Sequence, residues 1–334
     1  MNIGKISENV LVRSVFKNID KVNKTDIGAA VGTDCAFFCD TVTAVGYVSG
    51  IAVESESKEC ITPAGLAIHR ACNNIAASGA VADTVTLSVS LPENYREIKL
   101  KSLMQDANKV AGELHIKIAG GHTETVADIK TPVISAFAIG HKIVGKDAAI
   151  DVTSHPGQYI VMTKWMAIDG TVALTREFFD KLRTKLPSFL LKDALYMQRF
   201  LSVVPEAAVA VNHGDLCMHD CSDGGVFAAL WQLAERDNVG LEVDLRTIPV
   251  RQETIEVAEF FDINPYKLNS QGSLLIVTDT PKELISELAK EEILGTCIGR
   301  ITDGHDKVIV MNEERRFLES PRQDEIVNIW YNVD

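Results

Sequence analysis

The sequence predicts a two-domain α/β protein in which short strands alternate with amphipathic helices. Its 334 residues exceed what one ordinary hydrophobic core needs, so length alone favours about two domains. Hydrophobic residues make up 46% and charged residues 24%, a composition typical of globular proteins. A Pro-Gly turn within residues 154–157 interrupts both helices and strands. We therefore expect domains at residues 1–153 and 154–334.

The first domain is predicted to be an α+β half, and its best-defined element is a helix. Thr62 is a good N-cap, Pro63 suits the first helical position and Gly79 ends the apolar helical spacing. A second, longer amphipathic helix is expected over about residues 93–114. Strands are predicted at residues 36–39, 47–53, 81–89, 115–119 and 133–140.

The second domain continues the alternation of strands and helices. Strands are predicted at residues 159–163, 216–219, 241–244, 274–278 and 297–301. Helices are expected from about residue 170, over about 186–200, over 206–212 and from 223 to about 236. Such alternation favours a sheet covered by helices on both faces, an α/β/α layering.

Charge and hydropathy narrow the classes of partner. The formal net charge of −13 disfavours nucleic acid, which is bound by clustered Lys and Arg. The longest apolar stretch, near residues 133–139, is too short to cross a bilayer, so no membrane partner is expected. Residues 1–10 lack the pattern of a signal peptide, and we expect a cytoplasmic protein.

The seven cysteines are expected to be mostly reduced thiols, because they form an odd set in a chain without an export signal. Cys217, His219 and Cys221 alternate along a predicted strand, which makes a zinc site conceivable. Their spacing is not C-x-x-C, and no second pair follows. Packed, structural thiols are therefore the favoured interpretation of Cys217 and Cys221.

Two segments of the first domain combine glycine with acidic residues. Residues 32–36 (GTDCA) deliver Asp34 to the start of a strand, although Asp beside Gly is also an ordinary turn former. Residues 120–124 (GGHTE) follow a predicted strand, and two glycines there could turn N–H groups toward an anion. A plain strand-exit turn explains this second segment equally well.

Residues 218–225 (MHDCSDGG) form the most informative segment. A buried strand ends at an acidic residue, and a helix begins a few residues later. An Asp at a strand end beside a helix N-terminus can hold Mg²⁺ or act as a base. We expect a functional role for Asp220, and we expect Asp223 to cap the helix.

Other common catalytic and nucleotide-binding motifs are incomplete or absent from the sequence. Residues 140–147 (GHKIVGKD) approach a P-loop, but Asp147 stands where a Ser or Thr must reach Mg²⁺. The sequence contains no G-x-S-x-G, H-E-x-x-H or G-x-G-x-x-G pattern. Serine hydrolase, zincin and dinucleotide-binding functions therefore have no support.

Taken in order, these segments resemble the aminoimidazole ribonucleotide synthetase superfamily, especially its synthetase-related branch similar to hydrogenase-maturation factors. The N-terminal matches are residues 4–6 (GKI), 32–36, 71–76 (ACNNIA), 79–80 and 120–124. The C-terminal matches are residues 163–164 (TK), 169–171 (DGT), 218–225, 248–250 (IPV) and 268–275 (LNSQGSLL). The resemblance implies a homodimer whose N-terminal domains pair into a shared β-barrel, with ATP and Mg²⁺ in a cleft completed by the C-terminal domain.

The resemblance also implies roles for particular residues. Nucleotide contacts are implied at Gly4, Lys5, Asn73, Gly120, Gly121, His122, Thr123, Lys164, Gly224 and Gly225. Magnesium ligands are implied at Asp34, Glu54, Asn74, Glu124 and Asp220, with Asp220 also as the catalytic base. The chain departs from the family at residues 73–74, where Asn-Asn replaces Asn-Asp, and at residues 53–54, where Val-Glu replaces a Ser/Thr-Asp pair. Asn74 offers only a neutral oxygen, whereas Glu54 keeps a carboxylate.

Three functions compatible with the resemblance remain. The leading expectation is an ATP-dependent kinase of a small molecule, of riboside type such as α-ribazole, because residues 220–224 (DCSDG) look like the D-x-S-D-G of thiamine-monophosphate kinases. The first alternative is a hydrogenase-maturation-like activating or dehydrating enzyme. Those enzymes carry the reacting group on a C-terminal cysteine, whereas the last cysteine here is Cys297. The second alternative, prompted by Asn74, is a dimeric nucleotide-binding protein without turnover.

Overall fold

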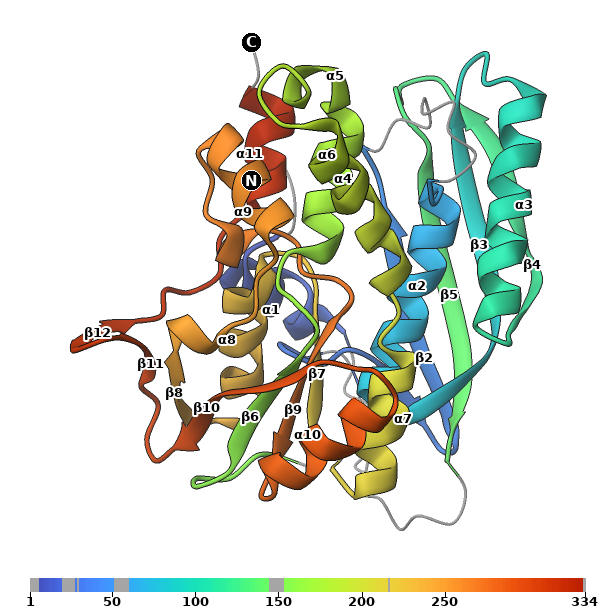
Figure 1. Ribbon diagram of the computed structural model, residues 1–334. Coiled ribbons are helices and arrows are strands. Elements are labelled where there is room, and N and C mark those ends of the chain that lie inside the picture. Colours follow the sequence, from blue (N-terminus) through green and yellow to red (C-terminus); the bar gives the residue numbers. More distant parts are fainter. Residues whose placement is uncertain are drawn as a thin grey trace. The chain divides into compact units, whose positions relative to one another are not determined.

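The structure is a computed structural model that describes residues 6–19, 28, 30–50, 60–143, 153–215 and 217–332 (Figure 1). The chain divides into two compact units. The N-terminal unit comprises Lys24–Ile27 and Asp34–Lys146. The C-terminal unit comprises Met1–Asn23, Gly28–Thr33 and Asp147–Asp334, so the first helix, α1 (Glu8–Ser14), and the turn η1 (Phe16–Asn18) belong to it.

The N-terminal unit is built on one five-stranded sheet in the order β1-β2-β5-β3-β4. Its strands are β1 (Ala36–Phe38), β2 (Thr41–Val48), β3 (Ala80–Pro92), β4 (Lys117–Val126) and β5 (Val133–Lys142). Neighbours are antiparallel except β3 and β4, which run parallel and are connected through α3 (Glu97–Glu113). Within the residues described, the sheet is open, with β1 and β4 at its edges, so a closed barrel is not seen in the single chain.

Helix α2 (Pro63–Ala77) covers one face of this sheet and confirms the prediction from its capping residues. The Thr62 hydroxyl accepts a hydrogen bond from the Gly65 amide (3.4 Å), and Thr62 itself donates to Asp106 of α3 through its amide (2.8 Å) and hydroxyl (2.7 Å). A Cβ on Gly46 of β2 would overlap the Ala67 carbonyl oxygen. Glycine at this strand position therefore lets α2 approach the sheet closely.

Two predictions for this unit are wrong. A strand was expected at residues 47–53, but the strand in this region, β2, spans Thr41–Val48. Residues 51–59 fall outside the described part of the chain. The turn expected at residues 120–124 lies inside strand β4, which pairs with β3 along its whole length. A Cβ on Gly121 would overlap the Leu87 carbonyl oxygen, so this glycine serves close pairing with β3.

The C-terminal unit contains a seven-stranded mixed sheet in the order β12-β11-β8-β10-β6-β9-β7. The strands are β6 (Tyr159–Thr163), β7 (Met218–Cys221), β8 (Gly240–Asp244), β9 (Ser273–Thr278), β10 (Gly295–Thr302), β11 (Lys307–Met311) and β12 (Glu314–Phe317). Both β6 and β7 run antiparallel to β9, which lies between them. The carboxyl ends of β6 and β7 therefore reach the same edge of the sheet, where β9 begins.

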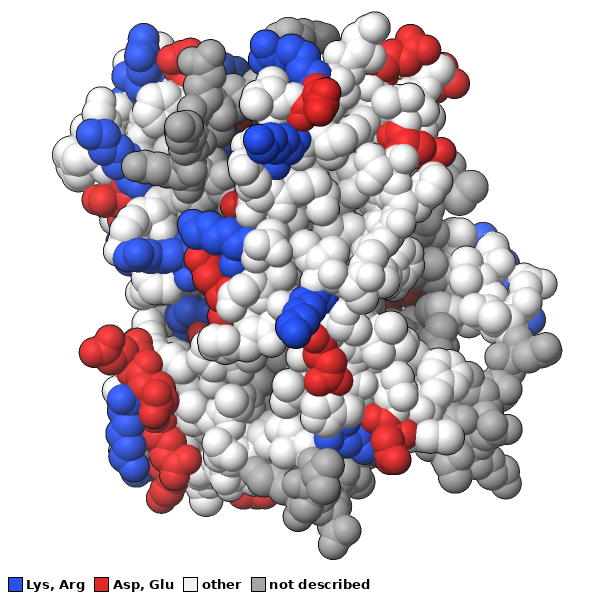
Figure 2. All heavy atoms as spheres, turned by 90° about the vertical axis from the view of Figure 1, so that its right-hand side faces the viewer, with Lys and Arg blue, Asp and Glu red and all other residues white. Residues whose placement is uncertain are grey.

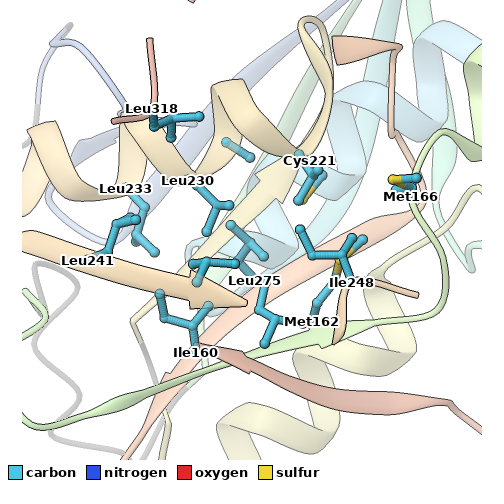
Figure 3. Close-up of a cluster of buried hydrophobic side chains, with 14 of the residues drawn as sticks. Ile160, Met162, Met166, Cys221, Leu230, Leu233, Leu241, Ile248, Leu275 and Leu318 are labelled. Atoms are coloured by element: carbon cyan, nitrogen blue, oxygen red, sulfur yellow. The ribbon is translucent and has the colours of Figure 1, made fainter. Parts of the chain in front are cut away.

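Helices cover both faces of this sheet, in agreement with the expected three layers. The helices are α4 (Ile168–Glu177), α5 (Phe179–Leu182), α6 (Ser188–Tyr196), α7 (Val204–His213), α8 (Gly225–Asp237), α9 (Gln252–Phe261), α10 (Pro281–Lys290) and α11 (Glu325–Asn332), with short turns η2 (Met197–Phe200), η3 (Leu245–Thr247) and η4 (Pro265–Lys267). Ile160 and Met162 of β6 point into a core shared with Leu230 of α8 (Figure 3). The intervening Val161 is buried on the opposite face, where α7 and α10 pack.

Strands β11 and β12 and helix α11 were not predicted. This part of the chain still completes the core, because Ile309 of β11, Leu318 just after β12 and Ile326 of α11 belong to the same buried cluster as residues of β6 and α8. None of the helices, over the residues described, is both long and apolar enough to cross a membrane.

Candidate functional site

Polar side chains, all but one of them buried, lie at one edge of the C-terminal sheet, near the carboxyl ends of β6 and β7 and the start of β9. We call Lys164, Asp220, Asp223, Asn269 and Asp324 the strand-end cluster. Buried polar groups are costly unless they are hydrogen-bonded, so a cluster of them at the end of an otherwise apolar sheet is a candidate functional site.

Asp220 occupies the end of β7, opposite Leu274 of β9, and only 3% of its surface is exposed. Helix α8 begins five residues later, at Gly225. Burial lowers the pKa of Lys164, and the Asp220 carboxylate is one of the charges that oppose this shift. A buried carboxylate at a strand end beside a helix N-terminus has the chemistry to hold a cation or accept a proton, as predicted for Asp220.

Lys164 follows β6 in a left-handed conformation (φ 54°), and its ammonium is saturated by protein partners. It donates to the carbonyl oxygens of Phe200 (2.9 Å) and Ser202 (2.6 Å), and it pairs with Glu206 of α7 at 2.6 Å. Burial lowers the pKa of Lys164, whereas Glu206 and Asp220 oppose that shift. An ammonium has three protons, so direct contact with a nucleotide requires Lys164 to release one of these partners.

The connection from β7 to α8 differs from the prediction. Asp223 is not the N-cap of α8; that position is Gly224, and no side chain caps the helix from it. Asp223 instead accepts a hydrogen bond from the Asn269 amide group at 2.7 Å. Gly224 and Gly225 are left-handed (φ 84° and 70°), a geometry that glycine adopts without strain, so the chain enters α8 without the extended N-cap that Asp223 would need.

The amides of these two glycines are already bound within the protein. Gly224 donates to Asp324 at 2.6 Å, and Gly225 donates to the Ser222 carbonyl oxygen at 3.0 Å. A Cβ on Gly225 would overlap the Tyr266 carbonyl oxygen. In this structure, therefore, both glycines shape the backbone, and neither amide is presented to a phosphate.

Sequence reasoning gave no role to Asn269, Asp324 or Glu206. Asn269 joins several segments: its side-chain oxygen accepts from the Gln271 amide (2.9 Å) and its backbone oxygen from the Gly170 amide (2.9 Å). Burial and the nearby Asp223 raise the pKa of Asp324 to about 7. The polar run at residues 269–272 before the fully buried strand β9 was a usable signal for Asn269, whereas Asp324 and Glu206 lie in none of the motifs that the sequence analysis singled out.

The site residues predicted in the N-terminal unit lie on its sheet and on α2. Asp34 is partly buried just before β1, and Asn73 is fully buried in α2. The side chain of Asn74 donates to the Val45 carbonyl oxygen at 3.3 Å. Gly120, Gly121, His122, Thr123 and Glu124 are all exposed on β4. Gly4, Lys5 and Glu54 lie outside the described residues.

His122 and Glu124 project from the same face of β4, since they are two residues apart on a strand. Their side chains lie 3.6 Å apart, and they face Ser88 and Ser90 of β3. The Ser90 hydroxyl donates to Glu124 at 3.5 Å. This face of the N-terminal sheet therefore carries an exposed polar row next to the glycines of β4.

The oxygen donors of both units suit Mg²⁺, which binds through one or two carboxylates together with nucleotide phosphates. No group of three Asp, Glu, His or Cys side chains gathers into a metal site by itself in the part of the chain that the structure describes. Asp220 fits the role of such a carboxylate, because it supplies a hard oxygen ligand and leaves the remaining positions to the nucleotide and water.

Cys217 and Cys221 are both buried. The Cys217 thiol lies 3.2 Å from the Arg236 guanidinium and 3.5 Å from the Asp237 carboxylate, and burial raises its pKa to about 12. A thiol with so high a pKa is a poor source of the thiolate that zinc binds. This geometry favours the structural role predicted for both cysteines.

Comparisons with known proteins find relatives along the whole chain. A putative hydrogenase expression/formation protein of Methanocaldococcus jannaschii is 24% identical over 98% of this chain and 97% of its own length. A carbamoyl dehydratase HypE of Rhizobium leguminosarum bv. viciae is 24% identical over 64% of this chain and 59% of its own length. A thiamine-monophosphate kinase of Pyrococcus horikoshii is 26% identical over 73% of this chain and 72% of its own length.

Solved structures share the fold at lower identity. HypE in a HypE–HypF complex superposes with a TM-score of 0.76 at 17% identity, covering 93% of this chain and 99% of that one. HypE in complex with ATP gives 0.68 at 17% identity, covering 97% and 98%. ThiL complexed with AMPPCP and TMP gives 0.68 at 18% identity, covering 97% and 99%.

Two family models account for most of the sequence. The model of the AIR synthase related protein, N-terminal domain, matches residues 28–141. The model of the AIR synthase related protein, C-terminal domain, matches residues 155–312. The motifs that suggested the resemblance fall mostly within these two matches, and both halves occur in the family's order. The chain belongs to the AIR synthase-related family.

Proposed function

We propose that this protein is an ATP- and Mg²⁺-dependent enzyme that places a phosphoryl group on an oxygen atom of a small molecule. The observation that carries the proposal is the position of Asp220: a carboxylate 3% exposed, near the end of β7 and before the start of α8. It lies close enough to Lys164 to oppose, together with Glu206, the lowering of the Lys164 pKa by burial. A base or metal ligand at such a strand end is suited to phosphoryl transfer. HypE and ThiL, which share the fold, have been solved with ATP and with AMPPCP.

Activation followed by loss of phosphate is the reaction that the relatives favour. The match to the Methanocaldococcus jannaschii hydrogenase expression/formation protein covers nearly the full length of both chains, and carbamoyl dehydratase HypE is a further relative. In this reading the phosphoryl group is placed on a carbonyl-type oxygen, which then leaves as phosphate. This preference replaces the kinase as the leading function.

A small-molecule kinase is the second candidate, and residues 220–224 (DCSDG) are the observation in its favour. They resemble the D-x-S-D-G of thiamine-monophosphate kinases, one of which is 26% identical over 73% of the chain. In this reading the phosphoryl group stays on the acceptor, for which ribosides such as α-ribazole are candidates.

The residue roles are proposed as the family implies them. Asp220 acts as base and, with Asp34, Glu54, Asn74 and Glu124, binds Mg²⁺. Two carboxylates about 4 Å apart repel by roughly 4 kcal/mol at an effective dielectric near 20, and nucleotide phosphates add further negative charge. Mg²⁺ therefore has to bind together with ATP if these carboxylates line one site.

We also propose a homodimer in which a second copy covers the exposed face of the N-terminal sheet. Val45 and Tyr47 of β2 (both 52% exposed) and Phe137 and Ile139 of β5 (44% and 40%) lie on the face opposite α2. Val45 is directly opposite Phe137 in the ladder. Figure 2, which turns the right-hand side of Figure 1 toward the viewer, shows a broad stretch of surface without charged side chains to the right of the centre of the view. Contiguous exposed apolar surface of this kind is typical of an interface.

One experiment separates the candidate reactions. Purified protein is incubated with Mg²⁺, ATP and each candidate acceptor, and ³¹P NMR measures ADP, free phosphate and any new phosphate ester. The activating reaction yields ADP and free phosphate in equal amounts and only with a carbonyl-bearing acceptor. A kinase yields ADP and a phosphate ester, whereas Mg²⁺-ATP binding without turnover under every condition contradicts an enzymatic function.

A further inference from the structure

Asp324 has more partners than the N-cap of a helix requires. It precedes α11, and its Oδ1 accepts the Ile326 amide at 2.9 Å, which is an ordinary capping bond. Its Oδ2 accepts the Gly224 amide at 2.6 Å, from a residue 100 positions earlier in the chain. N-caps are usually exposed, but Asp324 is only 6% exposed. Helix capping therefore explains neither the hydrogen bond that Oδ2 accepts from Gly224 nor the burial of Asp324.

The Gly224 amide lies in the turn that carries the candidate catalytic residue. Gly224 and Gly225 are consecutive left-handed residues, and four positions separate Asp220 from Gly224. Glycine loses more conformational entropy on folding than any other residue. Two consecutive glycines therefore leave the conformation of this turn poorly determined by its own sequence. Its conformation needs contacts from outside the turn.

The outside contacts come from two sides. Asn269 binds the Asp223 carboxylate at 2.7 Å, and the Ser270 amide donates to the Ser222 carbonyl oxygen at 3.2 Å. The Asp324 carboxylate accepts the hydrogen bond from the Gly224 amide. The backbone amide of Asn269 also donates to the Asp324 carboxyl group. The turn is thus held between residues 269–270 and the segment that precedes α11.

We propose that Asp324 is a positioning residue of the nucleotide site: its carboxylate fixes the Gly224 amide and so sets the turn from which Asp220 and the start of α8 are presented. The effect of Asp324 on nucleotide binding rests on the proposed function, whereas its effect on the conformation of the turn does not. Asp324 is not a catalytic residue, because it acts through Gly224 rather than on substrate.

The test uses a substitution that separates the two bonds of Asp324. Asp324→Ser retains a good N-cap for α11, but its shorter side chain cannot reach Gly224. Asp237→Ser is the matched control, because Asp237 is also a buried carboxylate that accepts a backbone amide, that of Ser154 at 2.9 Å, at the opposite end of α8. Asp237→Ser also removes an ion pair with Arg236 (2.7 Å), so it is the more disruptive substitution of the two and a stringent control for general destabilisation of α8.

Two measurements are made on each full-length variant. Hydrogen–deuterium exchange without nucleotide reports the turn at residues 222–226, and titration calorimetry reports the Kd for Mg²⁺-ATP. A buried amide that loses a charged acceptor should exchange about 10- to 100-fold faster. We expect this increase at residues 222–226 in Asp324→Ser with α11 unchanged, together with a Kd raised about tenfold or more. Asp237→Ser should speed exchange near residue 154 and leave the Kd within about twofold of the wild type.

The outcomes are distinguishable. Unchanged exchange at residues 222–226 in Asp324→Ser overturns the positioning role. Faster exchange with an unchanged Kd overturns its connection to the nucleotide site. An equal rise of Kd in Asp237→Ser shows general destabilisation of α8 and also overturns the proposal. If the wild type does not bind Mg²⁺-ATP, the proposed function fails, and the exchange data alone decide whether Asp324 positions the turn.

Discussion

Replacement of Glu206 by Gln isolates the contribution of the buried Lys164–Glu206 ion pair. The two charged groups lie 2.6 Å apart, and their side chains are 7% and 3% exposed. Removal of one partner from a buried pair leaves the other charge uncompensated, which costs about 3–5 kcal/mol. A unit of this size changes its melting temperature by roughly 2–4 °C per kcal/mol, so we expect a loss of about 6–20 °C.

The pH dependence of stability gives the sign of the effect. Burial already lowers the pKa of Lys164, and Glu206 is the largest influence that opposes this shift. In Glu206→Gln the pKa of Lys164 falls further, so the unfolded chain binds more protons than the folded one between that lowered pKa and the ordinary value of 10.5. Stability of this variant should therefore rise with pH through the alkaline range, more steeply than in the wild type.

Urea denaturation followed by tryptophan fluorescence at several pH values measures both effects. Lys164→Met is the reciprocal control, because it leaves the Glu206 carboxylate buried alone. The double variant Lys164→Met/Glu206→Gln should be more stable than either single variant, since no uncompensated charge remains. A cost below 1 kcal/mol for Glu206→Gln, with additive effects in the double variant, would refute the reasoning and leave the Lys164 ammonium available to a ligand.

Four further predictions concern function, assembly and metal content. Asp220→Asn should keep the melting temperature within a few degrees and lower Mg²⁺-dependent turnover by about two orders of magnitude or more, the scale for losing a positioned base; full activity in both Asp220→Asn and Asp34→Asn would put the site elsewhere. Asp223→Asn should be milder, because an Asn oxygen can still accept the hydrogen bond from the neighbouring amide. Sedimentation at micromolar concentration should give a dimer, and a monomer would contradict the proposed interface. Elemental analysis of untagged protein should find no stoichiometric zinc at Cys217 and Cys221.

Local signals in the sequence predicted the elements that local forces determine. Thr62, Pro63 and the apolar spacing placed α2 correctly, because capping and packing act within a few residues of the helix start. Strand β6 was placed at its observed ends, because its residues form a continuous apolar run bounded by a turn. The three-layer arrangement of the C-terminal unit followed from the alternation of such elements.

The errors arose where distant parts of the chain decide the outcome. Residues 120–124 are a strand and not a turn, because pairing with β3 satisfies the backbone that glycine would otherwise free. Asp223 does not cap α8, because Asn269 binds its carboxylate and Asp324 takes the amide at Gly224. Asp220 could be proposed from the sequence, since a strand end and a helix start meet at it. Asn269 lies in the polar run at residues 269–272, which offered a signal, but its contact with Asp223 could not be predicted, and nothing in the sequence pointed to Asp324, about 100 positions after Asp220.

The 100-residue separation between Gly224 and Asp324 has a consequence for synthesis of the protein. At about 5–20 residues per second, the ribosome needs roughly 5–20 s to make the intervening chain. During this interval the nascent chain carries the β7–α8 connection without its buried acceptor. The same interval delays Leu318 and Ile326, whose side chains complete the core around α8. Nascent chains that stall before residue 324 therefore expose apolar surface of the C-terminal sheet, which makes them clients for chaperones and prone to aggregate.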